Sequence, residues 1–254
     1  MSLTFIFLLS PRRNEGAFMK AIICAAGDSK RMSDITKSVP KPLLPLGSKS
    51  IIENLLDAVA VEPVDEIIIL VGYLADQIKE KIGNDFKGIP VSYITNETYS
   101  TTNNMYSIYL AKDKIDDDIV FVSGDVYIEP EIGRDFIRNE YADSVIIDDN
   151  PKHFTSDDPV KVTIKDSIVA IDKKLSKDNV NGVAIGIYKF SSGLIQKYFK
   201  IAADFIEKGH IQYGYIEPIK ILINQNKIMP FYIKGKWMDI DTIEEYETAK
   251  NLIG

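Results

Sequence analysis

The chain has 254 residues, and 45% of them are hydrophobic, which is enough for one large buried core or two small ones. A formal net charge of -7 argues against a nucleic-acid or anionic-membrane surface, because such surfaces need clustered positive charge. One cysteine, Cys24, and two histidines cannot assemble a disulfide framework or a Cys/His zinc site. Any metal must therefore be held by carboxylates, which favours Mg²⁺, and the expected partners are small molecules.

The first 18 residues contain an apolar run, Leu3 to Leu9, that lacks a preceding basic segment and is too short to span a bilayer. We expect residues 1–18 to be an N-terminal extension and Met19 to begin the folded domain. The remainder shows no spanning segment, so the sequence predicts a cytoplasmic protein without membrane insertion.

From Lys20 onward, short apolar runs alternate with amphipathic helices. Strands are predicted at residues 20–26, 66–72, 91–95 and 118–125, and helices at 50–60, 73–83 and 103–115. Strands that read as continuous apolar runs and alternate with helices are typical of a parallel sheet covered on both faces. The sequence therefore predicts a doubly wound α/β fold with a mixed, mostly parallel sheet.

After about Tyr141 the predicted strands follow one another closely, separated by short polar turns, at residues 142–149, 160–166, 167–174 and 181–190. We expect them to extend the sheet with mixed or antiparallel strands. Helices at 192–209 and 215–225, a strand at 227–235 and a helix from Thr242 complete the chain. Because no long Gly/Ser/Pro linker interrupts this pattern, residues 19–254 are predicted to form a single domain.

The loop after the first predicted strand starts with small residues and continues with basic ones: Ala25, Ala26 and Gly27, then Lys30, Arg31 and Lys41. Ligands of parallel sheets bind at the carboxyl ends of the strands, where this loop lies. Small residues let backbone N–H groups approach phosphate oxygens, and the cations neutralise the phosphate charge. A plain strand-to-helix turn with exposed, solvated lysines is the alternative. The loop matches neither GxGxxG nor GxxxxGK[ST], which disfavours a dinucleotide-binding or Walker-type domain.

The stretches AAGDSKR and VPKPLLPLGSKSIIE resemble the signature of the sugar-phosphate and phosphocholine nucleotidyltransferases, a strand followed by AAGxGxR and a Pro-Lys-Pro segment. The resemblance runs from about Met19 to the C-terminus. It implies a Mg²⁺-dependent enzyme that moves a nucleoside monophosphate from an NTP to a small phosphorylated acceptor and releases pyrophosphate. Arg31 and Lys41 would then bind the triphosphate and stabilise charge at the α-phosphorus. Ser29 replaces the second glycine of the signature.

The segment TTNNMYSIYLAKDKI is predicted to begin a helix with Thr102 as its cap. An ordinary amphipathic helix would explain the pattern, but two adjacent asparagines at a helix N-terminus also suit recognition of a base or a ribose. The segment resembles the NN-aromatic-YSLYLA stretch of phosphocholine-type cytidylyltransferases, which favours CTP. That resemblance assigns to the nucleotide Asn103, Asn104 and Ser107. A sugar-1-phosphate enzyme that uses UTP, dTTP or GTP is the alternative.

Asp125 ends a predicted strand, and Asp239 and Asp241 lie in WMDIDT before the last helix. Alternation along a strand puts Asp239 and Asp241 on one face and Ile240 on the other. Mg²⁺ takes one or two carboxylates together with phosphate oxygens and water. Turn or capping roles are the alternative, because Asp241 and Glu244 spell an Asp-x-x-Glu pattern. The family resemblance implies that the three aspartates bind the metal.

The acceptor would bind the C-terminal half of the chain, where Lys173 matches a lysine that contacts the acceptor phosphate in similar enzymes. A solvated lysine at a strand end is the alternative. The stretch QYGYIEP, with Tyr213, Tyr215 and Glu217, resembles the lining of the choline pocket in phosphocholine enzymes. Aromatic faces and a carboxylate would hold an ammonium group, and core tyrosines are the alternative. The sequence leaves open the identity of the acceptor and a homodimeric assembly.

A non-catalytic nucleotide-binding regulator on the same fold is disfavoured, because binding a base needs none of the three carboxylates. The two histidines, His153 and His210, are interpreted as surface residues without chemistry, and Trp237 as a packing residue.

Overall fold

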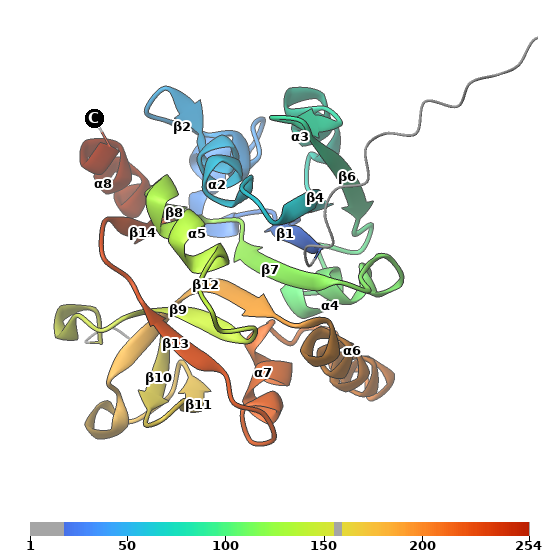
Figure 1. Ribbon diagram of the computed structural model, residues 1–254. Helices are drawn as coiled ribbons and strands as arrows, with labels where there is room; N and C mark the ends of the chain where they lie inside the picture. Colours follow the sequence, from blue (N-terminus) through green and yellow to red (C-terminus); the bar gives the residue numbers. More distant parts are fainter. Residues whose placement is uncertain (1–17, 155–158, 254) are drawn as a thin grey trace, which may run out of the picture.

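The computed structural model describes residues 18–154 and 159–253, which form a large sheet with helices on both faces (Figure 1). The predicted N-terminal extension lies outside the described residues except for Phe18, and the first strand begins at Met19. Ten strands belong to the main sheet, in which the central order is β12-β7-β1-β4-β6.

The N-terminal half of the sheet is parallel. It contains β1 (Met19–Ala25), β4 (Val64–Val71), β6 (Ile89–Thr95) and β7 (Asp118–Ser123). Successive residues of these strands point to opposite faces, and both faces are buried: Ile22 packs in one hydrophobic cluster and Ile23 in another. Burial on both faces explains why these strands read as continuous apolar runs, and the predicted doubly wound α/β sheet is confirmed.

The C-terminal half adds mostly antiparallel strands. It contains β9 (Ser144–Asp148), β10 (Val160–Ile164), β11 (Ile168–Asp172), β12 (Gly182–Phe190) and β13 (Met229–Tyr232). The long strand β12 pairs antiparallel with β7, β9 and β10. Its pairing with β9 shifts register around Gly186, whose φ of 84° favours glycine. The exception is β13, which pairs parallel with β9. A short strand, β5 (Asp85–Phe86), pairs with β6.

Helices cover the two faces of the sheet. One face carries α2 (Ile51–Val59), α3 (Ala75–Ile82) and α5 (Pro130–Ile137), and the other carries α4 (Asn104–Tyr109), α6 (Ser192–Glu207) and α7 (Ile216–Leu222) (Figure 1). None of the helices in the described part of the chain is long and apolar enough to cross a membrane.

A third, smaller cluster joins the C-terminus to the loop after β1. It involves α8 (Ile243–Ile253), the hairpin of β2 (Pro45–Leu46) and β3 (Lys49–Ser50), and the pair of β8 (Val126–Ile128) and β14 (Trp237–Asp239). The remaining short elements are α1 (Ser33–Thr36) and the 3-10 turns Lys30–Met32, Lys41–Leu43, Lys112–Lys114, Pro151–Phe154 and Lys177–Asn179.

Two local expectations differ from the structure. The helix predicted over 103–115 is α4, which ends at Tyr109 and is followed by a 3-10 turn, and its N-cap is Asn103 rather than Thr102. Asn103 Oδ1 accepts a hydrogen bond of 2.8 Å from the Asn104 backbone N–H. The short helix α5 was not predicted, since its eight residues include Gly133, a weak helix former.

We predict that Gly133→Ala destabilises the fold, although alanine is normally the better helix residue by about 1 kcal/mol. A Cβ at position 133 would lie 2.3 Å from the carbonyl oxygen of Ala58, so that α5 and α2 would have to move apart. The expected loss is about 1–3 kcal/mol in the free energy of unfolding, measured by urea denaturation. The matched control is Gly193→Ala in α6, where a Cβ meets nothing within 4 Å. Equal stability of both variants would refute this account of the helix contact.

Candidate active site

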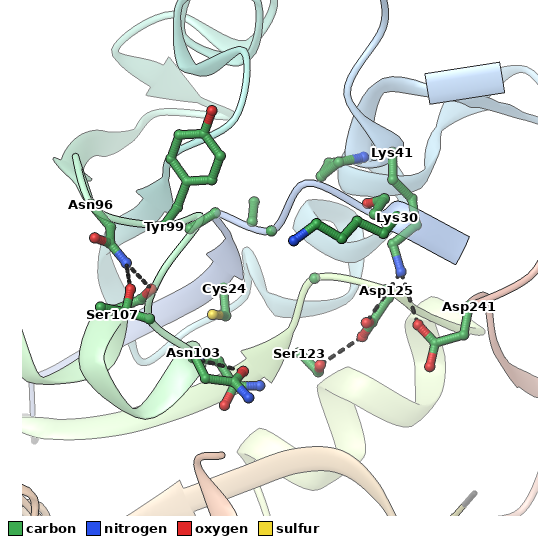
Figure 2. Close-up of a pocket in the computed structure, with 18 of the residues that line it drawn as sticks. Cys24, Lys30, Lys41, Asn96, Tyr99, Asn103, Ser107, Ser123, Asp125 and Asp241 are labelled. Atoms are coloured by element: carbon green, nitrogen blue, oxygen red, sulfur yellow. Dashed lines mark hydrogen bonds and ion pairs between the residues drawn. The ribbon is translucent and has the colours of Figure 1, made fainter. Parts of the chain in front are cut away.

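The carboxyl ends of β1 and β7 open into a cavity of about 340 Å³ (Figure 2). All the residues predicted to bind the nucleotide or its triphosphate line this cavity, which we call the first cavity: Ala25, Ala26, Gly27, Arg31, Lys41, Asn103, Asn104 and Ser107. Two of the predicted metal ligands, Asp125 and Asp241, line it as well. The sheet therefore brings together side chains that are more than 200 residues apart in sequence.

Two glycines let the strand ends approach one another. A Cβ at Gly124 would lie 2.1 Å from the carbonyl oxygen of Cys24, and a Cβ at Gly72 would lie 2.6 Å from that of Ala26. Neither position tolerates a side chain without a backbone shift. The sequence reasoning did not single out these glycines, although a glycine directly after a buried strand was the available signal.

The loop after β1 keeps the backbone conformation of a glycine at Ser29. The φ and ψ of this serine are 52° and 45°, in the left-handed region that glycine adopts readily. Its carbonyl oxygen accepts a hydrogen bond of 2.8 Å from the backbone N–H of Met32, and Met32 is fully buried. The substitution of the signature glycine by Ser29 thus leaves the turn intact, and the buried methionine anchors it.

Lys41 is the buried cation of the site. Its Nζ lies 3.2 Å from Asp125 Oδ2, 3.1 Å from Asp241 Oδ1 and 2.9 Å from the carbonyl oxygen of Ile240. The alternative of an exposed, solvated lysine is therefore wrong for Lys41, because this side chain is only 10% exposed. Burial opposes its charge, but Asp125 and Asp241 outweigh that effect and raise the pKa of Lys41.

The three predicted metal ligands lie together. Asp125, Asp239 and Asp241 each offer a carboxylate oxygen, and these atoms lie within 4.8 Å of one another. The β8–β14 pairing places them, with the Ile240 backbone N–H donating to the carbonyl oxygen of Asp125 at 2.8 Å. Ile240 is fully buried, as the predicted alternation requires. Arg31 Nη2 lies 2.5 Å from Asp241 Oδ2.

The electrostatic environments of these carboxylates differ. Burial raises the pKa of Asp125, but the charge of Lys41 and a hydrogen bond of 2.6 Å from Ser123 Oγ reverse this and lower it. The side chain of Asp239 is exposed to the cavity, yet the enclosing protein, then Asp125 and Asp241, raise its pKa well above the usual value. A cation among the three would relieve this repulsion, and an all-oxygen ligand set suits a hard cation.

The capping alternative for Asp241 is wrong. Glu245 Oε2 accepts from the backbone N–H groups of Asp241 at 2.9 Å and Thr242 at 2.8 Å. The backbone N–H of Glu245 in turn donates to Thr242 Oγ1 at 3.2 Å. The capping box of α8 is therefore formed by Thr242 and Glu245, and the Asp241 carboxylate points to Lys41 and Arg31 instead.

A buried asparagine that the sequence reasoning missed organises the opposite wall of the first cavity. Asn96 is 2% exposed, and its Nδ2 donates to Thr102 Oγ1 at 2.9 Å and to Ser107 Oγ at 3.0 Å. Figure 2 shows Asn96, Tyr99 and Ser107 across the cavity from Lys41 and the aspartates. The signal for Asn96 was a polar residue directly after a predicted strand.

The two adjacent asparagines connect the cavity to the segment before α7. Asn103 Nδ2 donates to the carbonyl oxygen of Gln212 at 3.2 Å, and Asn104 Oδ1 accepts from the backbone N–H of Tyr215 at 2.7 Å. Both side chains still line the first cavity. They therefore link the wall of that cavity to the residues predicted to contact the acceptor.

A larger cavity of about 1020 Å³, the second cavity, adjoins the first and shares with it the two aspartates at positions 125 and 241. The predicted residues that line it include Asp239, Lys173, Tyr215 and Glu217. Tyr213 is not among its lining residues, because its ring stacks on His210 with centroids 4.6 Å apart.

The lining residues of the second cavity already have protein contacts. Glu217 Oε1 accepts from Lys220 Nζ at 2.8 Å, and Tyr215 packs between the rings of Phe121 and Tyr188, at centroid distances of 5.1 and 5.6 Å. Burial raises the pKa of Tyr215 well above its usual value, so its hydroxyl stays protonated. Tyr215 thus lines the second cavity, as predicted, and also packs in the core, as the alternative interpretation required.

Comparison with known proteins gives a consistent picture. The sequence profile of the nucleotidyl transferase family matches residues 20–254. The bifunctional protein GlmU of Methanococcus maripaludis is 32% identical over 236 residues, which are 92% of this chain and 54% of that protein. The choline-phosphate cytidylyltransferase of Streptococcus pneumoniae is 33% identical over 126 residues, which are 48% of this chain and 52% of that protein.

Among solved structures, the inositol-1-phosphate CTP transferase from T. maritima superimposes with a TM-score of 0.75 at 18% identity, covering 93% of this chain and 97% of that one. This likeness concerns the fold. The chain spans about half the length of GlmU, and the match to the choline-phosphate cytidylyltransferase covers about half of each protein.

We predict that Lys41→Met lowers stability, because it leaves Asp125 and Asp241 without their buried counter-ion. The expected loss is about 2–3 kcal/mol, or a fall in Tm of roughly 4–10 °C, measured by thermal unfolding at pH 7 in EDTA. Lys30→Met is the control, since Lys30 is 77% exposed and its ion pair with Asp28 is solvent-screened. If both variants unfold at the wild-type temperature, Lys41 does not hold the carboxylates together.

Proposed function

The chain belongs to the nucleotidyl transferase family, and we propose that it transfers CMP from CTP to a small phosphorylated acceptor, with release of pyrophosphate. The observation that carries the proposal is the cluster of Asp125, Asp239 and Asp241, which lies where the two cavities meet. Two substrates that react at phosphorus must meet at one point, and a cation held by this cluster would neutralise the phosphate charge at that point.

In the proposed reaction the first cavity holds CTP. Backbone N–H groups around Ala26 and Gly27 would approach the triphosphate, and Asn103 and Asn104 would face the nucleoside. An oxygen of the acceptor phosphate, entering from the second cavity, would attack the α-phosphorus in line with the departing pyrophosphate. No general base is needed, because the acceptor phosphate is already ionised.

Mg²⁺ is the proposed metal, and the three aspartates would hold it. When bound, Mg²⁺ supplies positive charge that neutralises the phosphate oxygens during transfer. Lys41 forms ion pairs with both Asp125 and Asp241 and so holds these two carboxylates close together. Arg31, which is 53% exposed, can exchange its contact with Asp241 for a phosphate oxygen of the triphosphate.

The preference for CTP is supported by the Asn103-Asn104 segment, which resembles phosphocholine-type cytidylyltransferases, and by the similarity to a choline-phosphate cytidylyltransferase. The second candidate is a sugar-1-phosphate nucleotidyltransferase that uses UTP, dTTP or GTP. Similarity to GlmU over 92% of the chain favours this candidate. Pyrophosphate release from each NTP with phosphocholine, phosphoethanolamine, aminoethylphosphonate, inositol phosphate and glucose 1-phosphate separates the two.

The acceptor would bind Lys173 through its phosphate and would meet Tyr215 and Glu217 with its other end. An ammonium group near Glu217 would compete with Lys220, which also lies 2.6 Å from Asp172 Oδ2. Tyr213 does not line this pocket. Its stacking on His210 would instead position the segment that carries Tyr215.

We predict that Asp125→Asn and Asp241→Asn each lower kcat for pyrophosphate release about a hundredfold or more, because loss of a metal ligand removes several kcal/mol of transition-state stabilisation. Circular dichroism verifies that each variant is folded. Asp113→Asn, at a carboxylate that is 82% exposed and lines neither cavity, is the control and should retain the wild-type rate. A folded variant of Asp125 or Asp241 with a near-wild-type kcat at saturating Mg²⁺ would show that the metal assignment is wrong.

A further inference from the structure

One wall of the second cavity contains residues to which the proposed reaction assigns no role. His153, in the 3-10 turn after β9, and Trp237, in β14, line the cavity near Asp239. Their rings pack edge to face with centroids 5.9 Å apart. His153 was expected to be a surface residue without chemistry, and its side chain is 48% exposed, but the exposed part belongs to a cavity wall.

A buried carboxylate orients both rings. Asp148, at the end of β9, is 5% exposed, and its Oδ2 lies 2.5 Å from His153 Nδ1 and 2.6 Å from Trp237 Nε1. Its Oδ1 accepts from the backbone N–H of Asn150 at 2.8 Å. The tryptophan N–H can only donate, so we assign the Asp148 carboxylate as the acceptor of both contacts and place the proton of the His153 ring on Nδ1. The remaining polar atom of the imidazole is Nε2.

The position of this wall relative to the reaction site follows from strand geometry. Trp237 and Asp239 are two residues apart on β14, which places them on the same face and about 6.5–7 Å apart. Lys173, Glu217, Trp237 and His153 all line this one cavity, together with the aspartates. An acceptor whose phosphate lies between Lys173 and the aspartate cluster can therefore reach the wall of Trp237 and His153 with its other end, as well as the wall of Tyr215 and Glu217.

We propose that His153, oriented by Asp148, is a specificity-determining residue that accepts a hydrogen bond at Nε2 from a hydroxyl or N–H group at the acceptor end opposite the phosphate. The proposal rests on the proposed function for the location of that phosphate. It narrows the acceptor class to phosphorylated molecules with a distal hydrogen-bond donor. Phosphoethanolamine and sugar phosphates have such a donor, whereas the quaternary ammonium of phosphocholine has none.

The single tryptophan of the chain provides a direct test, because Trp237 is the only source of indole fluorescence. Emission is followed during titration with phosphoethanolamine, glucose 1-phosphate and phosphocholine, with and without Mg²⁺ and α,β-methylene CTP. We expect tighter binding of one or both donor-bearing compounds than of phosphocholine. His153→Ala should raise the Kd of the preferred donor-bearing compound about tenfold and change that of phosphocholine less than twofold.

Two further variants separate recognition from structure. His153→Gln retains a side-chain acceptor and should recover part of the lost affinity, which a purely structural role would not explain. Tyr141→Ala is the control, since this ring side chain is exposed and lines neither cavity, and the substitution should leave every Kd unchanged.

The proposal is overturned if no compound changes the emission, if phosphocholine binds the wild type most tightly, or if His153→Ala leaves all affinities unchanged. Pyrophosphate release measured in parallel tests the proposed function separately. Absence of turnover with CTP, together with intact His153-dependent binding, would overturn the CTP assignment and support the role of His153.

Discussion

The architecture of the site depends on one buried ammonium group. Lys41 comes from the loop after β1, Asp125 from the end of β7 and Asp241 from the segment after β14, and these carboxylates are 84 and 200 residues away from the lysine in sequence. Three carboxylates within 4.8 Å of one another repel, and the pKa of Asp239 is raised by its enclosure in the protein and then by that repulsion. The buried cation makes the cluster compatible with a folded protein before any metal binds.

The surrounding backbone leaves these carboxylates free of capping hydrogen bonds and turned toward the cavities. Gly124 allows the end of β7 to approach β1, and Glu245 satisfies the backbone N–H groups at the start of α8, so that Asp241 is not used as a cap. Ser29 adopts a left-handed backbone conformation, which turns the loop back toward the cavity. The left-handed backbone of Ser29 is strained for a residue with a side chain, and position 124 admits only glycine. Such local strain is typical of functional sites.

Sequence patterns predicted the parallel half of the fold, because buried strands read as apolar runs. Of the site residues predicted from strand ends and from the family resemblance, only Tyr213 lines neither cavity. The patterns did not predict the burial of Lys41, which depends on partners far away in the chain. For the same reason His153 was interpreted as a surface residue, since its partners Asp148 and Trp237 meet it only in three dimensions. The helix around Gly133 was missed because glycine is a weak helix former, and its close contact with Ala58 of α2 is formed only in the folded chain.

Electron paramagnetic resonance of Mn²⁺ titrated into Asp239→Asn decides whether the three aspartates form a cation site. Asp239 is the informative position, because its enclosure by the protein and then the charges of Asp125 and Asp241 raise its pKa, and its own charge therefore opposes folding at neutral pH. We expect the variant to bind Mn²⁺ at least tenfold more weakly than the wild type, while its Tm in EDTA is equal or higher. An unchanged Mn²⁺ affinity in the folded variant would exclude Asp239 as a ligand of the cation.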